Sequence, residues 1–202
     1  MKKLILKLCF AVMAVAFMSG AALAEFNLRL TLDTPGTFTM KGTNSIDYDV
    51  DFSATFSGDF MKRVAGQYLK LGGGFEIPSP RKFSYKSHSS NDPIWYLPLY
   101  FSVQTNPVPN AGLFFKLNIG YNLFFLNTNW DASYRSNFSY NGGLYYAFAA
   151  GYEFPFGLIA DVTYAVYNGT LKYTHYYTPV SFDETYKKVG VSIGYKVGRE
   201  RR

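Results

Sequence analysis

The stretch from Gly142 to Thr170 constrains the fold more than any other part of the chain. In its first half, from Leu144 to Phe154, every second residue is apolar and the intervening positions are mostly small or polar. After Pro155 the same alternation resumes and continues to Tyr167. A period of two is typical of β-strands, because successive side chains point to opposite faces. The stretch therefore predicts a tight β-hairpin with one apolar, aromatic face and one face of small and polar residues.

The same alternation recurs in six further stretches, at 26–33, 48–57, 69–77, 95–104, 113–123 and 189–197. The eight expected strands are joined by connections that alternate between long and short. The long ones are polar segments at about 34–46, 78–94, 127–141 and 171–185. Long loops on one side and short turns on the other are typical of outer-membrane barrels. A sheet in lipid must also close on itself, because every backbone polar group needs a partner. We therefore predict a closed antiparallel eight-stranded transmembrane β-barrel with up-and-down meander topology, rather than a soluble sandwich.

The first 24 residues have the pattern of a secretory signal peptide. Three lysines precede an apolar core, and Ala22-Leu23-Ala24 provides a cleavage site with small residues. We expect a signal peptide at 1–24, an outer-membrane barrel domain at 25–198 and a basic tail at 199–202. Removing the three lysines lowers the formal charge from +6 to +3, and export argues against nucleic-acid binding. The mature chain also loses Cys9, its only cysteine.

In such a barrel the apolar series faces lipid and the second series fills the lumen. The second series carries charges of both signs, which would be costly to bury unless they pair with one another. An eight-stranded barrel is only wide enough for side chains to fill it. We therefore expect a packed polar plug, with a lumen network of Arg29, Asp49, Asp51, Lys70, Glu76, Lys116, Glu153, Asp161, Lys188 and Lys196. The aromatic residues near the strand ends, such as Trp95 and Phe156, predict the interfacial girdles of a membrane barrel.

The hairpin at 142–170 and the closing segment KKVGVSIGYKV resemble the small outer-membrane β-barrels of the OmpX and OmpA type. The resemblance covers essentially the whole mature sequence. It implies insertion by the barrel-assembly machinery, aided by a terminal strand that ends in an aromatic residue. Here Tyr195 is the last aromatic residue, and the basic tail follows it. These patterns indicate architecture and carry no catalytic signature.

Signals for chemistry are sparse. Some barrels of this size are lipid A deacylases with a His-x-Ser pair, and His88-Ser89-Ser90 has that spacing in a Ser-rich segment. A nucleophile needs its base and orienting acid held in place, so a solvated loop is the favoured interpretation. His88 and His175 without a mature cysteine do not make a metal site, and no cofactor is expected. The basic residues Arg81, Lys82 and Lys86 could contact lipopolysaccharide phosphates or glycans.

The sequence therefore predicts a non-enzymatic barrel of the bacterial outer membrane. Its expected role is envelope structure or surface interaction through four long extracellular loops. The first alternative is a narrow channel or carrier for small solutes, and the second is a lipid A-modifying enzyme. Expected partners are outer-membrane lipid and lipopolysaccharide, the barrel-assembly machinery during biogenesis, and a host or surface ligand.

Overall fold

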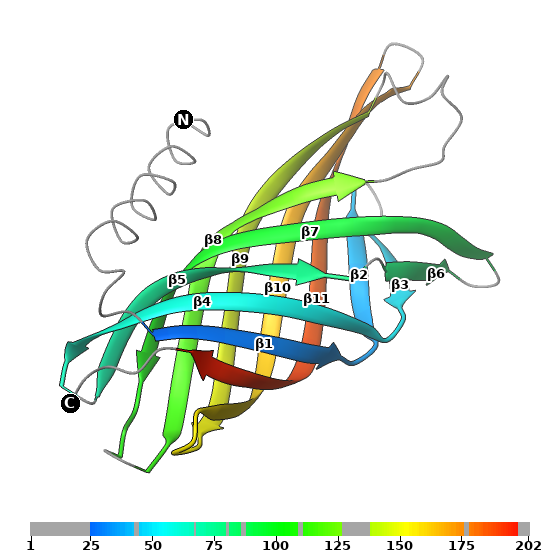
Figure 1. Ribbon diagram of the computed structural model, residues 1–202. Helices are drawn as coiled ribbons and strands as arrows, with labels where there is room; N and C mark the ends of the chain where they lie inside the picture. Colours follow the sequence, from blue (N-terminus) through cyan, green and yellow to red (C-terminus); the bar gives the residue numbers. More distant parts are fainter. Residues whose placement is uncertain are drawn as a thin grey trace.

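The chain folds into strands alone over the residues that the structure describes, which are 25–42, 45–66, 68–79, 81–85, 88–108, 111–126, 138–175 and 178–197. The structure is a computed structural model (Figure 1). Its strands are β1 (Glu25–Asp33), β2 (Gly36–Lys41), β3 (Ser45–Val50), β4 (Ser53–Ala65), β5 (Leu69–Pro78), β6 (Arg81–Tyr85), β7 (His88–Thr105), β8 (Leu113–Leu126), β9 (Phe138–Glu153), β10 (Leu158–His175) and β11 (Thr178–Val197). The expected signal peptide and basic tail lie outside the described residues.

Eight of these strands form a closed barrel. Neighbours pair antiparallel in the order β1-β4-β5-β7-β8-β9-β10-β11, and β11 returns to β1 through the register Phe26↔Val197 to Asp33↔Gly190. The longest ladder joins β10 to β11 over 18 residue pairs, from Leu158↔Tyr195 to His175↔Thr178. Closure gives each of the eight strands a paired neighbour on both sides, which is the condition for crossing a bilayer. The predicted closed eight-stranded antiparallel barrel is therefore confirmed.

The other three strands extend the barrel wall at one end. They form a ribbon in the order β11-β2-β3-β6-β7 above β1, β4 and β5. Two strands of the barrel wall thus bend in the middle, β1 continuing as β2 after Thr34-Pro35 and β3 as β4 after Asp51-Phe52. We call this end the outer end, because long hairpins face outwards in outer-membrane barrels. The opposite end, with short connections at 66–68, 106–112 and 154–157, is the turn end.

The bends change which residues face inwards. In β1 the buried residues are the odd-numbered ones, whereas in β2 Phe38 is buried and Thr37 exposed. The same shift separates β3, where Val50 is buried, from β4, where Ser53 and Thr55 are buried. At each bend the alternation therefore shifts by one residue, so that inward positions are odd-numbered in β1 and β4 and even-numbered in β2 and β3.

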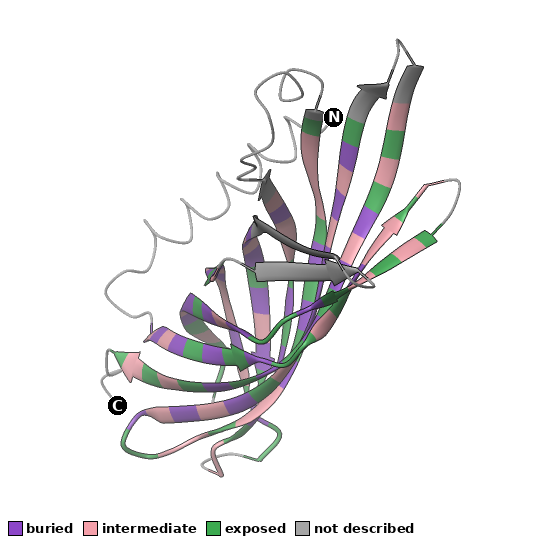
Figure 2. Cartoon of the chain, turned by 90° about the vertical axis from the view of Figure 1, so that its right-hand side faces the viewer, coloured by how far each residue is buried: buried purple, intermediate pink, exposed green. Residues whose placement is uncertain are grey.

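Below the bends, the exterior of the barrel is a band of exposed apolar side chains. Ile119 is 50% exposed, and Leu30, Phe148, Val162 and Val191 behave alike on four other strands. The alternation of buried and exposed residues runs along the wall strands in Figure 2. Beyond the band the exterior becomes polar, with exposed Thr37 and Lys187 at the outer end. An apolar exterior over a polar interior reverses the arrangement of a soluble protein and fits a lipid environment.

Three of the four expected long loops contain ordered strand. β2 and β3 occupy most of 34–46, β6 and the start of β7 occupy most of 78–94, and the β10–β11 hairpin extends through 171–185 apart from residues 176–177. The loop predictions were wrong there because polar residues on both faces hide the period-two pattern. Above the apolar band the exterior is in water, so strands no longer need an apolar face. Residues 127–137 of the fourth segment lie outside the described residues.

One seam interrupts the barrel wall. The β5–β7 ladder stops at Phe75↔Leu99, and pairing resumes only between β6 and β7 at Arg81↔Ile94. Pro78 and Pro98 lie in the unpaired stretches on the two sides, and each lacks an N–H to donate. Pro98 still has a register partner, Asn122 of β8, on its other side. The seam lies just below the bends, at the outer edge of the apolar band.

Candidate functional site

The lumen at the turn end is closed by an ion-pair network. The Lys70 ammonium lies 2.7 Å from the Glu25 carboxylate and 3.0 Å from the Glu153 carboxylate. Arg63 pairs with Glu25 at 3.3 Å, and Lys196 pairs with Glu153. These side chains come from β1, β4, β5, β9 and β11, so the network connects strands around the barrel.

A second network occupies the middle of the lumen around Asp59 of β4. Its carboxylate pairs with Arg29 and, at 3.0 Å, with Lys116, and it accepts a 2.6 Å hydrogen bond from the Tyr100 hydroxyl. Arg29 also pairs with Asp161 at 3.1 Å. A methyl group in place of hydrogen at Gly194 would lie 2.6 Å from Cγ of Arg29, so the bare backbone there leaves room for the arginine.

A third network lies nearest the outer end. The Tyr145 and Tyr167 hydroxyls each donate a 2.5 Å hydrogen bond to a different carboxylate oxygen of Glu76. Lys188 lies 2.9 Å from Asp33 and 3.8 Å from Glu76. The carboxylate of Glu76 therefore has two neutral donors and one cation.

The three networks balance in charge. Every basic group has an acidic partner within 4.0 Å, and the described lumen pairs comprise six bases and six acids. The bases are Arg29, Arg63, Lys70, Lys116, Lys188 and Lys196, and the acids are Glu25, Asp33, Asp59, Glu76, Glu153 and Asp161. Removing a single partner would leave a buried charge uncompensated, which is far more costly than replacing a whole pair.

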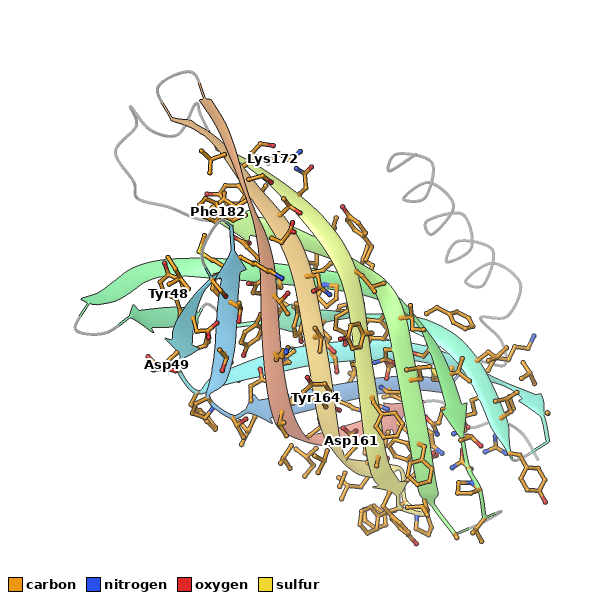
Figure 3. All side chains as sticks on the ribbon, turned by 180° about the vertical axis from the view of Figure 1, so that it is seen from behind. Tyr48, Asp49, Asp161, Tyr164, Lys172 and Phe182 are labelled. Carbon is orange, nitrogen blue, oxygen red and sulfur yellow. The ribbon has the colours of Figure 1, made fainter. Side chains whose placement is uncertain are left out.

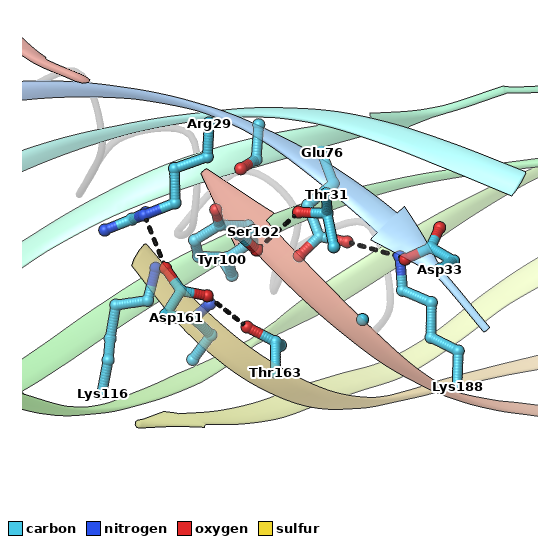
Figure 4. Close-up of a pocket in the computed structure, with 13 residues that line it drawn as sticks. Arg29, Thr31, Asp33, Glu76, Tyr100, Lys116, Asp161, Thr163, Lys188 and Ser192 are labelled. Atoms are coloured by element: carbon cyan, nitrogen blue, oxygen red, sulfur yellow. Dashed lines mark hydrogen bonds and ion pairs between the residues drawn. The ribbon is translucent and has the colours of Figure 1, made fainter. Parts of the chain in front are cut away.

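A small space that remains among these side chains is about the size of a water molecule. It lies between the central and outer networks, and Arg29, Asp33, Glu76, Lys116, Asp161 and Lys188 contribute to its lining (Figure 4). Across it, Arg29 reaches towards Asp161, while Lys188 reaches towards Asp33. The described side chains of the central and outer networks therefore lie close together around this space.

Above the networks the lumen is filled by aromatic side chains, which we call the aromatic cluster. Tyr145 and Tyr167 have ring centroids 5.1 Å apart, and Tyr96 stacks on Tyr186 at 5.8 Å. Phe38 of β2 belongs to the same buried cluster, and Met40, Tyr48 and Tyr140 pack against it as partly buried residues. The lumen thus changes from ionic at the turn end to aromatic at the outer end.

The structure brings together eight of the ten residues in the expected lumen network. The two exceptions are Asp49 and Asp51, which are exposed. Asp49 pairs in register with Thr37 of β2 on the outside of the outer ribbon, and Asp51 lies in the bend before β4. Figure 3 shows the side chain of Asp49 on β3 at the margin of the molecule, away from Asp161. The prediction was wrong because it carried one alternation through a bend that shifts the phase by one residue.

Sequence reasoning missed four charged members of the networks, namely Glu25, Asp33, Asp59 and Arg63. Asp33 and Asp59 were detectable, since the lumen-facing alternation runs through Asp33 in β1 and continues past Ser57 to Asp59 in β4. Arg63 lies next to an irregularity in the β4–β5 ladder, where the alternation is no guide. Tyr145 and Tyr167, which hold Glu76, lie in the lumen-facing series of the hairpin, but the predicted network included charged residues only.

The side chains of the expected loop residues lie outside the described part of the chain. Arg81 and Lys82 belong to β6 rather than to a loop, and their side chains lie outside the described residues, as does Lys86. His88 begins β7 and His175 ends β10, and the side chains of both are likewise not described. Among the residues that the structure describes, no group of three or more His, Cys, Asp or Glu side chains could hold a metal ion.

Together, the closed barrel, the apolar band and the charged lumen define a class of protein, the β-barrels of the bacterial outer membrane. Within the described part of the chain, no helix is long and apolar enough to cross a membrane. Comparison with solved structures gives the same fold. The chain is similar to the outer membrane protein OprG from Pseudomonas aeruginosa, with a TM-score of 0.55 at 15% identity over 88% of this chain and 97% of that one.

It is also similar to the outer membrane protein AlkL in lipid bilayers, with a TM-score of 0.51 at 17% identity, covering 89% of this chain and 94% of AlkL. No family model matches the sequence, and no curated protein matches it either. At these identities the likeness is one of fold. The narrower resemblance to OmpX- and OmpA-type barrels stays a prediction.

Proposed function

We propose that the protein is a non-enzymatic outer-membrane barrel, closed to aqueous solutes, that serves envelope structure or surface contact through its outer hairpins. The observation that carries the proposal is the stack of three charge-balanced networks across the lumen. A packed interior of this kind favours a rigid scaffold that holds exposed hairpins at the surface over a water-filled pore. The β2–β3, β6–β7 and β10–β11 hairpins supply the surface available for such contact.

Conductance of the refolded protein in planar bilayers tests the closed lumen. We expect no stable single-channel steps, with a porin in the same bilayers as the positive control. Stable single-channel conductance steps from the purified protein would contradict the proposal, because the networks would then not seal the lumen.

The expected contact with lipopolysaccharide has its own test. Replacing Arg81, Lys82 and Lys86 together by alanine should weaken binding to lipopolysaccharide vesicles, since it removes three positive charges that attract phosphates. Lys62 is exposed near the turn end and gives the matched control. Equal binding by the triple variant and the Lys62→Ala variant would remove these residues from the proposal.

A second candidate function is passage of small apolar molecules, and the seam between β5 and β7 favours it. The ladder between β5 and β7 does not extend to Pro78 and Pro98, and the residues near them include Tyr96 and Tyr100 of the aromatic cluster. An apolar molecule entering from the outer end could leave sideways into lipid there without crossing the ionic networks. Rearrangement of the aromatic side chains would be required, because they fill the lumen in this structure.

Cross-linking across the seam separates the two functions. Ile77→Cys and Leu97→Cys lie opposite one another if the β5–β7 register is continued, and the mature chain has no other cysteine. Lateral passage predicts that a short bismaleimide cross-link slows uptake of the apolar dye N-phenylnaphthylamine by expressing cells. The uncross-linked double variant is the control. Uptake that is independent of the cross-link would eliminate the lateral route.

Absence of catalysis is part of the proposal and is tested separately. The alternative is a lipid A-modifying enzyme that uses His88. Incubation with lipopolysaccharide and mass analysis of its acyl chains should show no change in lipid A. Acyl-chain release by the protein that is lost in the His88→Ala variant would establish the enzyme instead.

We also propose that the barrel-assembly machinery inserts the protein through β11, which closes the barrel against β1. The outward aromatic residue available on this strand near the turn end is Tyr195, which is 53% exposed. A Tyr195→Ser variant should slow insertion into vesicles that contain the machinery while leaving spontaneous refolding in detergent unchanged. Equal loss in both assays would indicate a folding defect instead.

A further inference from the structure

Glu184 is the one acidic lumen residue, among those described, that belongs to none of the three networks. It lies on the inward face of β11, two residues from Tyr186 towards the outer end, and is only 3% exposed. Its register partners are Met40 of β2 and Gly169 of β10, which has no side chain to fill the neighbouring space. Its Oε2 atom is buried without a hydrogen-bond partner.

No base in the described part of the chain compensates this carboxyl group. Lys188 faces inwards on the same strand, but it is engaged by Asp33 and Glu76. Lys41, Lys172 and Lys187, which are near in register, are exposed on the outside of the wall. Because the six bases and six acids of the networks already balance, Glu184 adds one uncompensated negative charge to the outer lumen when it ionises.

Burial raises the pKa of the Glu184 carboxyl from its usual 4.5 to about 8. The pKa of Tyr140 on β9 rises to about 12, first through its own burial and second through the nearby Glu184 charge. In the ladder, Glu184 lies opposite Gly169 of β10, which in turn lies opposite Gly142 of β9, two residues from Tyr140. A buried acid without a partner is costly to retain, so its position calls for an explanation.

The residues near Glu184 in the ladder include aromatic rings and the flexible side chain of Met40. Tyr186 and Phe38 belong to the buried aromatic cluster, while Met40, Tyr48 and Tyr140 pack against that cluster and are only partly buried. Phe38 and Tyr48 have ring centroids 6.0 Å apart. Partly exposed rings mark this region as the approach from the outer end. Aromatic faces attract organic cations, and cages of them recognise quaternary ammonium groups.

We propose that Glu184 and the rings around it form a binding site for a small organic cation carrying a quaternary ammonium group. The carboxylate supplies the compensating charge, and Tyr140 and Tyr186 supply aromatic faces. The methyl groups of such a cation need no hydrogen bonds, which matches a site where Met40 and Gly169 offer none from their side chains. Binding requires the partly buried Tyr140 and Met40 side chains to move aside, since the lumen is filled in this structure.

The site is tested with choline and its uncharged isostere 3,3-dimethylbutan-1-ol. The protein is refolded in octyl glucoside, because phosphocholine detergents would themselves compete. Isothermal titration calorimetry at pH 9 should show choline binding and at least about tenfold weaker binding of the isostere, a factor equal to 1.4 kcal/mol. Choline does not titrate at its nitrogen, so its affinity should rise with pH as Glu184 ionises around pH 8.

Two variants assign the effect. Glu184→Gln should lose choline binding and its pH dependence, whereas Asp183→Asn, an exposed neighbour on the same strand, should retain both. Tyr140→Leu should weaken choline binding without changing the pH at which affinity rises. Heat-modifiable gel mobility verifies that each variant is folded. Equal binding of choline and the alcohol, or undiminished binding in folded Glu184→Gln, would overturn the proposal, as would no binding by the wild-type protein.

Discussion

The Tyr145 hydroxyl donates a 2.5 Å hydrogen bond to the Glu76 carboxylate, joining β9 to β5 across the lumen. Hydrogen bonds to charged groups contribute more than neutral ones, about 1.5–3 kcal/mol each. Replacing Tyr145 by phenylalanine should therefore lower the free energy of unfolding by about that amount, as measured by urea titration in lipid vesicles. Tyr146→Phe is the matched control, because that neighbouring side chain is 40% exposed on the lipid side. Equal losses in both variants would mean that the lumen bond contributes nothing.

Asp59 should be the most sensitive position in the networks. Its carboxylate holds Arg29 and Lys116 together, so Asp59→Ala leaves two buried cations without that partner. We expect destabilisation of about 3–5 kcal/mol or failure to refold. Asp51→Ala provides the control, since Asp51 is exposed in the bend and its loss should change the unfolding free energy by about 0.5 kcal/mol or less. Stability of Asp59→Ala near the wild-type value would contradict the charge-balanced networks.

The apolar band makes a prediction about depth in the membrane. Ile119 lies midway along the exposed apolar series of β8, which runs from Leu113 to Leu123. Lysine at this position should cost about 2–4 kcal/mol of folding free energy in vesicles, because the charge would lie near the bilayer midplane. Thr37→Lys on the polar exterior of β2 should cost about 0.5 kcal/mol or less. If the two lysines were equally tolerated, the band would not face lipid.

Stability should depend on pH through Glu184. Its pKa is raised in the folded protein, to about 8 from 4.5, so the folded state binds the proton more tightly than the unfolded state. The stabilisation that comes from this tighter proton binding is fully present below pH 4.5 and is lost as the pH rises through 8. Without a bound cation, Glu184→Gln should flatten this part of the stability curve, measured by urea unfolding between pH 5 and pH 9. A wild-type curve with the same slope as the variant would place the carboxyl in water.

The barrel itself was predictable from the sequence because lipid imposes one rule on every spanning strand. In each strand that crosses the band, lipid-facing apolar residues must alternate with lumen-facing residues. The number of strands can therefore be counted from this alternation. The same alternation places Lys70, Lys116 and Glu153 in the lumen. Pro98 looked incompatible with a central strand, and it is placed where β7 has a partner on one side only.

The outer end was not predictable in the same way. Outside the bilayer the exterior of a strand is in water, so it needs no apolar residues. The period-two pattern of apolar residues is then lost, as in β2 and β3. Which acid pairs with which base is also a property of the closed barrel. Asp59 and Asp161 lie on β4 and β10, and only closure brings both to Arg29.

The two phase-shifting bends have an evolutionary consequence. Because Thr34-Pro35 and Asp51-Phe52 each shift the alternation by one residue, the hairpin between them is a module whose orientation depends on the length of both connectors. The β2–β3 register keeps Phe38 and Val50 on one face, so a single-residue deletion in one connector would leave the two connectors requiring opposite orientations of the hairpin. Paired deletions, one in each connector, would turn the module inside out and present Phe38, Tyr48 and Val50 to water. Relatives of this protein should therefore vary freely in the hairpin tip at 43–44 and hardly at all in the length of the two connectors.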